Sequence, residues 1–301
     1  MMQHSRREWL KSAGAAIGAA CLGGPLAEGA PARKLKIGIT SINWGFRPDD
    51  AEPGIREAAQ LGYQGYEVFG DSLDPLEAKG GLKAILQRHN FPMPSGYLNI
   101  NLHDPTVRKK QMENMARWGK LLQDCGAHVA VMGPMGVNRS TFDFNAAKAD
   151  IVATLNEAGK ILADFGLVAA LHQHTSTAVD TRDQVYAVME AVDTRVMKFG
   201  PDVGQLLKSG SDPVKILKDF LPLVRNIHLK DYLGEKYWGG YCPLGQGKVD
   251  LPAVLEILEN SEHLKYVMVE LDMTRGAPMT PLQCATTSKQ YLQNLGYSFL
   301  A

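Results

Sequence analysis

The sequence has few cysteines and no excess of charge of either sign. Its four cysteines, at positions 21, 125, 242 and 284, are too few and too scattered for a disulfide framework or a thiolate metal site. Lys and Arg together number 32, as do Asp and Glu, and no basic run occurs beyond the extreme N-terminus. Because nucleic-acid binding depends on clustered Lys and Arg that neutralise phosphates, we expect no nucleic-acid partner.

The sequence also lacks an apolar run long enough to cross a bilayer. The small apolar residues at 13–22 form a run of about ten, whereas a spanning helix needs about 20. Arg6 and Arg7 precede this run and Ala-Pro-Ala follows it at 30–32, which is the layout of a signal peptide. The arginine pair, followed by Trp-Leu-Lys, resembles the twin-arginine export signal. We predict that residues 1–32 are a removed twin-arginine signal peptide and that the mature protein is periplasmic, with no stable membrane insertion. An amphipathic N-terminal helix is the alternative.

From residue 34 onward, short apolar segments alternate with helical patterns. The expected strands are 34–40, 65–69, 95–101, 127–133, 167–172, 196–200, 224–229 and 266–271. The expected helices are 53–61, 75–89, 105–125, 145–165, 181–192, 212–220, 251–259 and 281–295. Eight strand–helix units predict an α/β fold with one (β/α)8 TIM barrel domain over residues 33–301. The alternative is a doubly wound open sheet, but no Gly-x-Gly-x-x-Gly turn follows the first strand.

Polar side chains collect where four of the expected strands end. His172 and His174 are two residues apart on one strand, so both side chains point to the same face. Glu270 ends an apolar Val-Met-Val run, and a carboxylate buried there must be paired or bound to a metal. A single buried histidine is more often a satisfied core residue, but two in register at a strand end favour a functional site.

The two strands between these segments end in the same way. Asp202 follows Pro201 at the end of one strand, although an aspartate there could also cap a helix. His228 and Lys230 lie near the end of the next strand with spacing that places them on one face. Together these strand ends predict a divalent-metal site at the carboxyl face of the barrel. Mixed nitrogen and oxygen donors suit Mn, Co, Fe, Zn or Mg.

Five segments occur in an order that resembles a known family. They are Leu171-His-Gln-His-Thr-Ser-Thr, Asp202-Val-Gly-Gln205, Ile227-His-Leu-Lys-Asp231, Gly245-Gln-Gly-Lys-Val-Asp250 and Val269-Glu270. They resemble the sugar isomerase/epimerase barrels of the xylose-isomerase-like superfamily and, within it, the inosose dehydratases most. The resemblance extends from Lys36 to about Leu295. It implies that Asp202, His228 and Glu270 are metal ligands and that His172 stands where most members have a glutamate ligand.

Two positions depart from this family pattern. The resemblance implies that epimerases of this family use two carboxylate bases, one on each face of the substrate. The first of these two carboxylates is replaced by His172 in this sequence. The family's Asp-x-Gly-His reads Asp-x-Gly-Gln, and Gln205 can hydrogen-bond a hydroxyl but cannot move a proton. Proton transfer then falls to Glu270, Lys230, His174 or Glu67. A metal that polarises a carbonyl beside one base supports enolisation, so isomerisation or β-elimination is expected rather than two-base epimerisation.

Four side chains are expected to contact the substrate: Glu67, Gln205, Trp44 and Trp238. Glu67 ends the second strand, where an inward-pointing carboxylate could bind a sugar hydroxyl or form a salt bridge. The two tryptophans lie in loops after the first and seventh strands. Aromatic side chains on such loops stack on sugar rings, and simple loop packing is the alternative.

These features predict a metal-dependent isomerase, epimerase-type enzyme or lyase that enolises an unphosphorylated sugar, keto-sugar or cyclitol, including β-elimination of a 3-keto glycoside. The export signal favours an unphosphorylated substrate, and no Gly-rich phosphate cradle or Arg cluster is present. The alternatives are a non-catalytic periplasmic carbohydrate-binding barrel and an abasic-site endonuclease-like hydrolase. The oligomeric state is open, and a homo-oligomer is one option.

Overall fold

Eight short apolar strands form one parallel sheet in the computed structural model, which describes residues 33–301. The strands are β1 (Lys36–Thr40), β2 (Tyr66–Phe69), β3 (Ser95–Ile100), β4 (Val129–Pro134), β5 (Val168–Leu171), β6 (Met197–Phe199), β7 (His228–Leu229) and β10 (Tyr266–Val269). Most of their residues are buried, as expected when helices cover a sheet whose other face forms the barrel interior. The predicted signal peptide, residues 1–32, lies outside the described residues.

The sheet curls into a closed ring. Its order is β6-β5-β4-β3-β2-β1-β10-β7, and the strand pairs are parallel. The end strands β6 and β7 are joined by parallel bridges, Phe199 with Val224 and Asp202 with His228. The predicted (β/α)8 barrel is therefore confirmed. A separate antiparallel hairpin, β8 (Asp231–Tyr232) with β9 (Tyr241–Cys242), follows β7.

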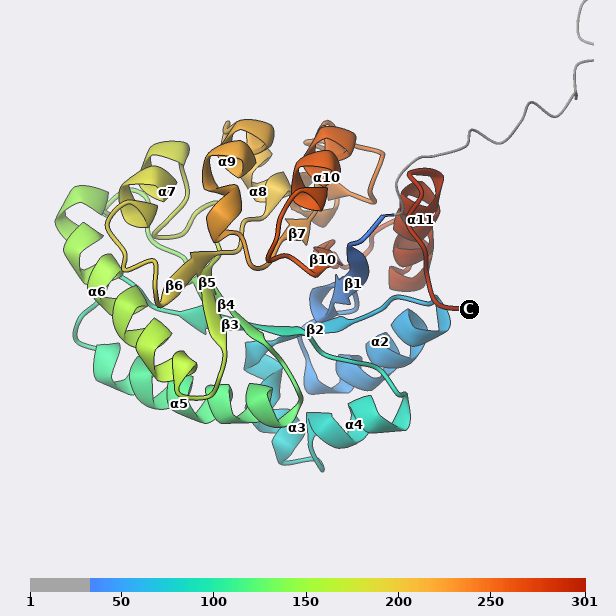
Figure 1. Ribbon diagram of the computed structural model, residues 1–301, viewed down its shortest axis with the longest axis horizontal. Helices are drawn as coiled ribbons and strands as arrows, with labels where there is room; N and C mark the ends of the chain where they lie inside the picture. Colours follow the sequence, from blue (N-terminus) through green and yellow to red (C-terminus); the bar gives the residue numbers. More distant parts are fainter. Residues whose placement is uncertain (1–32) are drawn as a thin grey trace, which may run out of the picture. The chain divides into compact units, whose positions relative to one another are not determined.

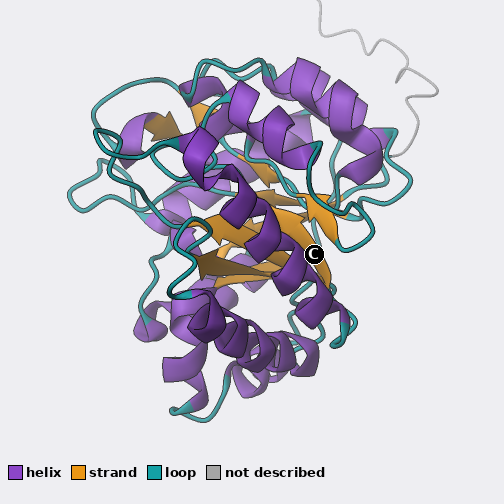
Figure 2. Cartoon of the chain, turned by 90° about the vertical axis from the view of Figure 1, so that its left-hand side faces the viewer, coloured by secondary structure: helices purple, strands orange, loops and turns teal. Residues whose placement is uncertain are grey.

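Helices surround the strands on the outside of the ring (Figures 1 and 2). They are α2 (Pro48–Gln60), α3 (Leu73–Glu77), α4 (Leu82–Arg88), α5 (Arg108–Asp124), α6 (Phe144–Ala163), α7 (Arg182–Met189), α8 (Val203–Lys208), α9 (Pro213–Phe220), α10 (Leu251–Glu259) and α11 (Pro281–Asn294). Short 3-10 turns occupy Ser41–Asn43, Gly70–Ser72, Leu221–Leu223 and Trp238–Gly240. Within residues 33–301, no helix combines the length and the apolar character that a membrane crossing requires.

Several helices differ from the sequence-based expectation, and α2 begins at Pro48 rather than at residue 53. The segment expected as one helix over 75–89 is split into α3 and α4 at Gly80 and Gly81, whose φ angles of 102° and 88° are incompatible with a continuing helix. Helix α5 begins at Arg108 rather than near 105, because the Asp104 carboxylate accepts bonds from Thr106 instead of capping α5. The short helix α8 was not expected at all.

The loop after β7 is organised by one buried carboxylate. Asp231 accepts hydrogen bonds from the backbone N–H groups of Tyr232, Gly245, Gly247 and Val249, at distances between 2.8 and 3.1 Å. A Cβ atom at Gly247 would lie 2.2 Å from Oδ1 of Asp231, so this close approach requires glycine. The His-x-Lys-Asp and Gly-x-Gly segments therefore form one structural unit beside the carboxyl face of the barrel.

Candidate active site

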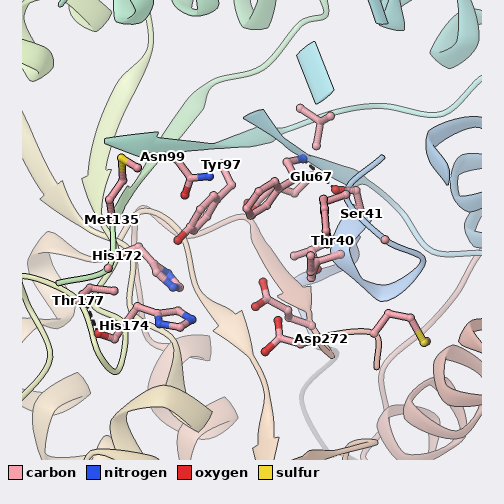
Figure 3. Close-up of a pocket in the computed structure, with 18 of the residues that line it drawn as sticks. Thr40, Ser41, Glu67, Tyr97, Asn99, Met135, His172, His174, Thr177 and Asp272 are labelled. Carbon is pink, nitrogen blue, oxygen red and sulfur yellow. Dashed lines mark hydrogen bonds between the residues drawn. The ribbon is translucent and has the colours of Figure 1, made fainter. Parts of the chain in front are cut away.

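A cavity of about 860 Å³ opens where the strands end at the carboxyl face. Its lining includes Glu67, Tyr97, His172, His174 and Glu270. Figure 3 shows the imidazoles of His172 and His174 pointing toward the side of the cavity where Asp272 lies. This is the face on which TIM barrels carry their active sites.

His228 lies between two carboxylates, one on each ring nitrogen. Its Nε2 is 2.6 Å from Oε1 of Glu67, and its Nδ1 is 2.6 Å from Oε2 of Glu270. Glu67 also accepts hydrogen bonds from Ser95 Oγ (2.6 Å) and Asn226 Nδ2 (2.9 Å), so its position is fixed. Burial opposes a charge on His228, but the Glu270 and Glu67 carboxylates outweigh burial and raise its pKa well above the ordinary value.

His172 presents a neutral imidazole beside His228. Its Nδ1 lies 3.1 Å from the Gly200 carbonyl and donates to it, so the lone pair is on Nε2. Burial and the nearby His228 hold the pKa of His172 well below its ordinary value. A histidine whose other ring nitrogen donates to a backbone carbonyl is oriented as metal-binding histidines are.

Asp202 has two different oxygens. Oδ1 accepts the backbone N–H of Gln205 at 2.9 Å and caps α8, which is the alternative role considered from the sequence. Oδ2 is buried and has no hydrogen-bond partner, although Nζ of Lys230 lies 3.4 Å away. Burial raises the pKa of the Asp202 carboxyl to about 6.

The donor atoms of these residues fit a divalent cation. Those of His172, Asp202 and His228 lie within 4.8 Å of one another, as do those of Glu67, His228 and Glu270. One buried atom in the cluster, Asp202 Oδ2, lacks a hydrogen-bond partner, and an unsatisfied buried polar atom is costly. His228 Nδ1 faces the Glu270 carboxylate at 2.6 Å, and a cation could be held between these two groups. Nitrogen and oxygen donors without thiolate suit a divalent metal. Of the two histidines on β5's end, His172 is the one in this cluster.

Lys230 is fully buried among carboxylates. Its Nζ lies 2.7 Å from Oε1 of Glu270 and 2.9 Å from Oδ2 of Asp272. Burial opposes the charge, but the carboxylates of Asp272, Glu270 and Asp202 raise the pKa of Lys230 well above its ordinary value. The side chain is therefore an ammonium at neutral pH and not a base. Asp272 was missed from the sequence, although it stands two residues after Glu270 with the spacing of one strand face.

His174 and Gln205 form a second polar pair. The Gln205 Oε1 accepts from the backbone N–H and the hydroxyl of Thr175, which orients its amide N–H₂ toward His174 Nε2, 2.7 Å away. Nδ1 of His174 donates to the Thr175 carbonyl at 2.8 Å, so Nε2 carries the lone pair. Burial and the Lys230 charge lower the pKa of His174, which keeps the imidazole neutral.

The two tryptophans expected at the substrate do not line the cavity. Trp44 donates its indole N–H to Glu57 of α2 at 2.7 Å, and Trp238 is buried against Tyr241, Leu271 and Cys284. Both are therefore used in loop packing, the alternative considered from the sequence. The aromatic lining comes instead from Phe46, Phe69 and Tyr97. No local pattern in the sequence indicates this, because the packing of the loops decides which loop aromatic faces the cavity.

An eight-stranded parallel barrel with its polar cluster at the carboxyl face defines the TIM-barrel class. The family described as "Xylose isomerase-like TIM barrel" matches residues 55–294, and the chain belongs to this family. This confirms the family resemblance noted in the sequence.

Individual relatives agree with this assignment. An inosose dehydratase of Clostridium botulinum is 27% identical over 293 residues, which covers 86% of this chain and 97% of that protein. The structure of the IolI protein with a bound zinc atom matches with a TM-score of 0.73 and 18% identity, covering 89% of this chain and 100% of the other. The E. coli 3-keto-D-glucoside 4-epimerase YcjR, in its apo form, matches with a TM-score of 0.69 and 18% identity over 87% of this chain and 100% of the other. The dehydratase and the epimerase are enzymes, in agreement with the prediction of an enzyme.

Proposed function

We propose that the protein is a divalent-metal-dependent lyase of an unphosphorylated keto-sugar or cyclitol that acts through enolisation, with isomerisation as the related activity. The observation that carries the proposal is the convergence of donor atoms from His172, Asp202 and His228 within 4.8 Å of one another at the carboxyl face of the barrel, where Asp202 Oδ2 is buried without a hydrogen-bond partner. The names of the relatives, an inosose dehydratase and a 3-keto-D-glucoside 4-epimerase, support this class of substrate.

His172, Asp202, His228 and Glu270 would hold the cation. When bound, it would polarise the substrate carbonyl and make the adjacent C–H more acidic. Glu67 holds the His228 ring in place from the opposite side through Nε2. Glu270 also contacts Lys230, so its charge is shared and it is a poor base on its own.

His174 is the base that the geometry favours. Its imidazole is neutral and lines the cavity, and its Nε2 accepts a hydrogen bond from the Gln205 amide at 2.7 Å, which would have to open before Nε2 takes a proton from the substrate. The proton from the carbon next to the carbonyl would move to Nε2 while that C–H electron pair forms the double bond of an enolate and the carbonyl π pair moves onto its oxygen. When the carbonyl re-forms, the enolate pair would make the double bond to the β carbon. The β C–O bond would then break, and the Lys230 ammonium would supply the proton to the leaving oxygen.

A two-base epimerisation is less well supported. The cavity wall also carries the carboxylates of Glu67, Asp272 and Asp50. Glu67 is occupied by Ser95, Asn226 and His228, Asp272 by Lys230, and Asp50 accepts from the backbone N–H of Arg47. His172 replaces the carboxylate that the family's epimerases have at that position. With one free base, abstraction followed by expulsion of a leaving group is favoured over inversion at a carbon.

We further propose that the protein acts in the periplasm after export by the twin-arginine route. An unphosphorylated substrate agrees with that compartment. Replacing Arg6 and Arg7 together with lysine is expected to retain the full-length precursor in the cytoplasm. Unchanged secretion of this variant would contradict the export proposal and leave the chemistry untouched.

The chemistry is tested by metal analysis combined with solvent exchange. The chelated protein would be titrated with Mn, Co, Zn and Mg and then incubated in deuterated water with an inosose and with a 3-keto glucoside. We expect deuterium at the carbon next to the carbonyl, and release of the leaving group, only after metal is restored. Metal binding without exchange or release on any substrate would favour the non-catalytic carbohydrate-binding alternative.

A further inference from the structure

The mouth of the cavity carries an unusual amount of exposed apolar surface. Five large apolar side chains are exposed in the described part of the chain, and two of them, Phe46 (59% exposed) and Met135 (46%), line this cavity. Single exposed apolar residues are normal on a protein surface. Two at the rim of one cavity, however, mark a surface that a ligand can cover.

Both side chains stand on an ordered backbone. The Phe46 carbonyl accepts a hydrogen bond from the buried Ser72 hydroxyl at 2.7 Å. The Met135 N–H donates to the Ile100 carbonyl at 2.9 Å, and the next residue, Gly136, pairs with Thr177 across the neighbouring loop. The exposed positions are therefore fixed before a ligand arrives, which lowers the entropy cost of binding.

An aromatic pair that lines the same cavity lies beside the donor cluster. The rings of Phe69 and Tyr97 are stacked, with centroids 5.1 Å apart and an interplanar angle of 11°. The Tyr97 ring lies 5.2 Å from the ring of His172 and 6.0 Å from that of His228. Figure 3 shows Tyr97 between Glu67 and the side of the cavity that carries His172 and Met135.

The cavity is also larger than one sugar ring requires. Its volume of about 860 Å³ is in the upper part of the range that holds drug-sized ligands. A ring bound at the donor cluster would leave the outer part, with Phe46 and Met135, for a second group. Flat rings suit aromatic walls, and the Met135 sulfur contacts aromatic rings favourably.

We infer that the outer part of the cavity is a subsite for an aromatic substituent, so that the substrate is an aryl glycoside of a keto-sugar rather than a free monosaccharide. This inference rests on the proposed function and names its substrate class. Arg47 and Arg275 line the same mouth and can donate to phenolic oxygens of such a substituent.

The test compares phenyl and methyl 3-keto-β-D-glucoside on the metal-loaded protein. Turnover gives kcat/KM, and calorimetry gives the affinity for each compound. The variants are Phe46→Ala and Met135→Ala, singly and together, and the matched control is Leu282→Ala, which removes an exposed apolar side chain (40% exposed) away from the cavity. Because all three side chains are exposed, folding is expected to be retained, and thermal unfolding checks this.

We expect the wild-type protein and Leu282→Ala to bind the phenyl compound about tenfold or more tightly than the methyl compound, from burial of one ring. In the double variant, this preference in affinity should fall to about threefold or less. Because phenoxide leaves more readily than methoxide, kcat/KM is compared between the wild type and the double variant for the phenyl compound alone, and it should fall by a similar factor. Equal affinity of the wild type for both compounds, or an undiminished preference in the double variant, overturns the subsite and leaves the proposed function standing.

The binding measurements distinguish the outcomes in which neither compound is turned over. Tighter binding of the phenyl compound that is lost in the double variant, without turnover of either compound, supports the subsite while the proposed lyase activity fails. Absence of binding and turnover with both compounds contradicts both.

Discussion

Nζ of Lys230 lies 2.7 Å from Oε1 of Glu270, so one buried ammonium is held against a carboxylate that also faces His228. Asp272 contacts the same ammonium at 2.9 Å. The Lys230 ammonium thus balances part of the buried negative charge of Glu270 and Asp272. This relationship gives the first prediction.

Replacing Lys230 with Met should abolish most turnover without preventing metal binding. The variant lacks the proposed proton donor, and removal of a general acid typically lowers kcat by about 10²–10⁴-fold. It also leaves carboxylates unpaired, which should cost about 3–5 kcal/mol of stability in the absence of metal. Added metal should restore part of this loss, because a cation again faces Glu270. Thermal unfolding with and without metal, elemental analysis and kcat measure these effects.

Lys208→Met is the matched control for this variant. Lys208 also lies near the hairpin and donates to the Gly239 carbonyl, but it contacts no carboxylate of the site. Its replacement should change kcat by less than about threefold. A Lys230→Met protein with full activity would remove the lysine from the mechanism.

The two histidines at the end of β5 should separate metal binding from proton transfer. His172 belongs to the donor cluster, so His172→Ala should weaken metal affinity by at least about 10–100-fold. His174 pairs with Gln205 outside that cluster, so His174→Ala should keep metal affinity while solvent exchange is lost. Chelator competition measures the affinity, and NMR measures the exchange. The opposite pattern would make His174 the ligand.

Metal affinity should rise with pH. Burial raises the pKa of Asp202 to about 6, and Glu270 and Glu67 overcome burial to raise the pKa of His228. A cation must displace these protons, so the apparent affinity should fall about tenfold per pH unit for each proton displaced. The His228 proton competes at every pH below its raised pKa, and the Asp202 proton adds to this below about pH 6. Because burial and His228 lower the pKa of His172, its imidazole carries no proton that the metal must displace, and it does not contribute to this pH dependence. Titrations between pH 5 and pH 8 check this, and an affinity that does not vary over this range would contradict it.

Strand ends were the part of the site that the sequence could predict. His172, Asp202, His228 and Glu270 each stop an apolar run, and neighbouring parallel strands bring their ends to one face. The loops could not be read in this way. Trp44 turns toward Glu57 of α2 whereas Phe46, two residues later, faces the cavity, and nothing local in the sequence distinguishes the two.

The contact between Glu67 and His228 was also beyond the sequence. The two residues are 161 positions apart and come from β2 and β7, which are not neighbours in the sheet. A contact across the barrel interior forms only when the whole ring of strands closes. No sequence pattern in β2 or β7 predicts the contact between Glu67 and His228. From the sequence, Glu67 could bind the substrate or form a salt bridge, and the structure places its carboxylate 2.6 Å from Nε2 of His228.

Glu67→Gln tests this orienting role. The amide keeps the size of the side chain but removes the charge that fixes the His228 ring, so metal affinity should fall by about 10–100-fold. With metal in excess, kcat should recover to within about fivefold of the wild type, because Glu67 moves no proton in the proposed reaction. Ser95→Ala removes one of the hydrogen bonds that hold Glu67 and should give a smaller effect in the same direction. If kcat of Glu67→Gln stayed low at saturating metal, Glu67 would be a base or a substrate contact, as the sequence suggested.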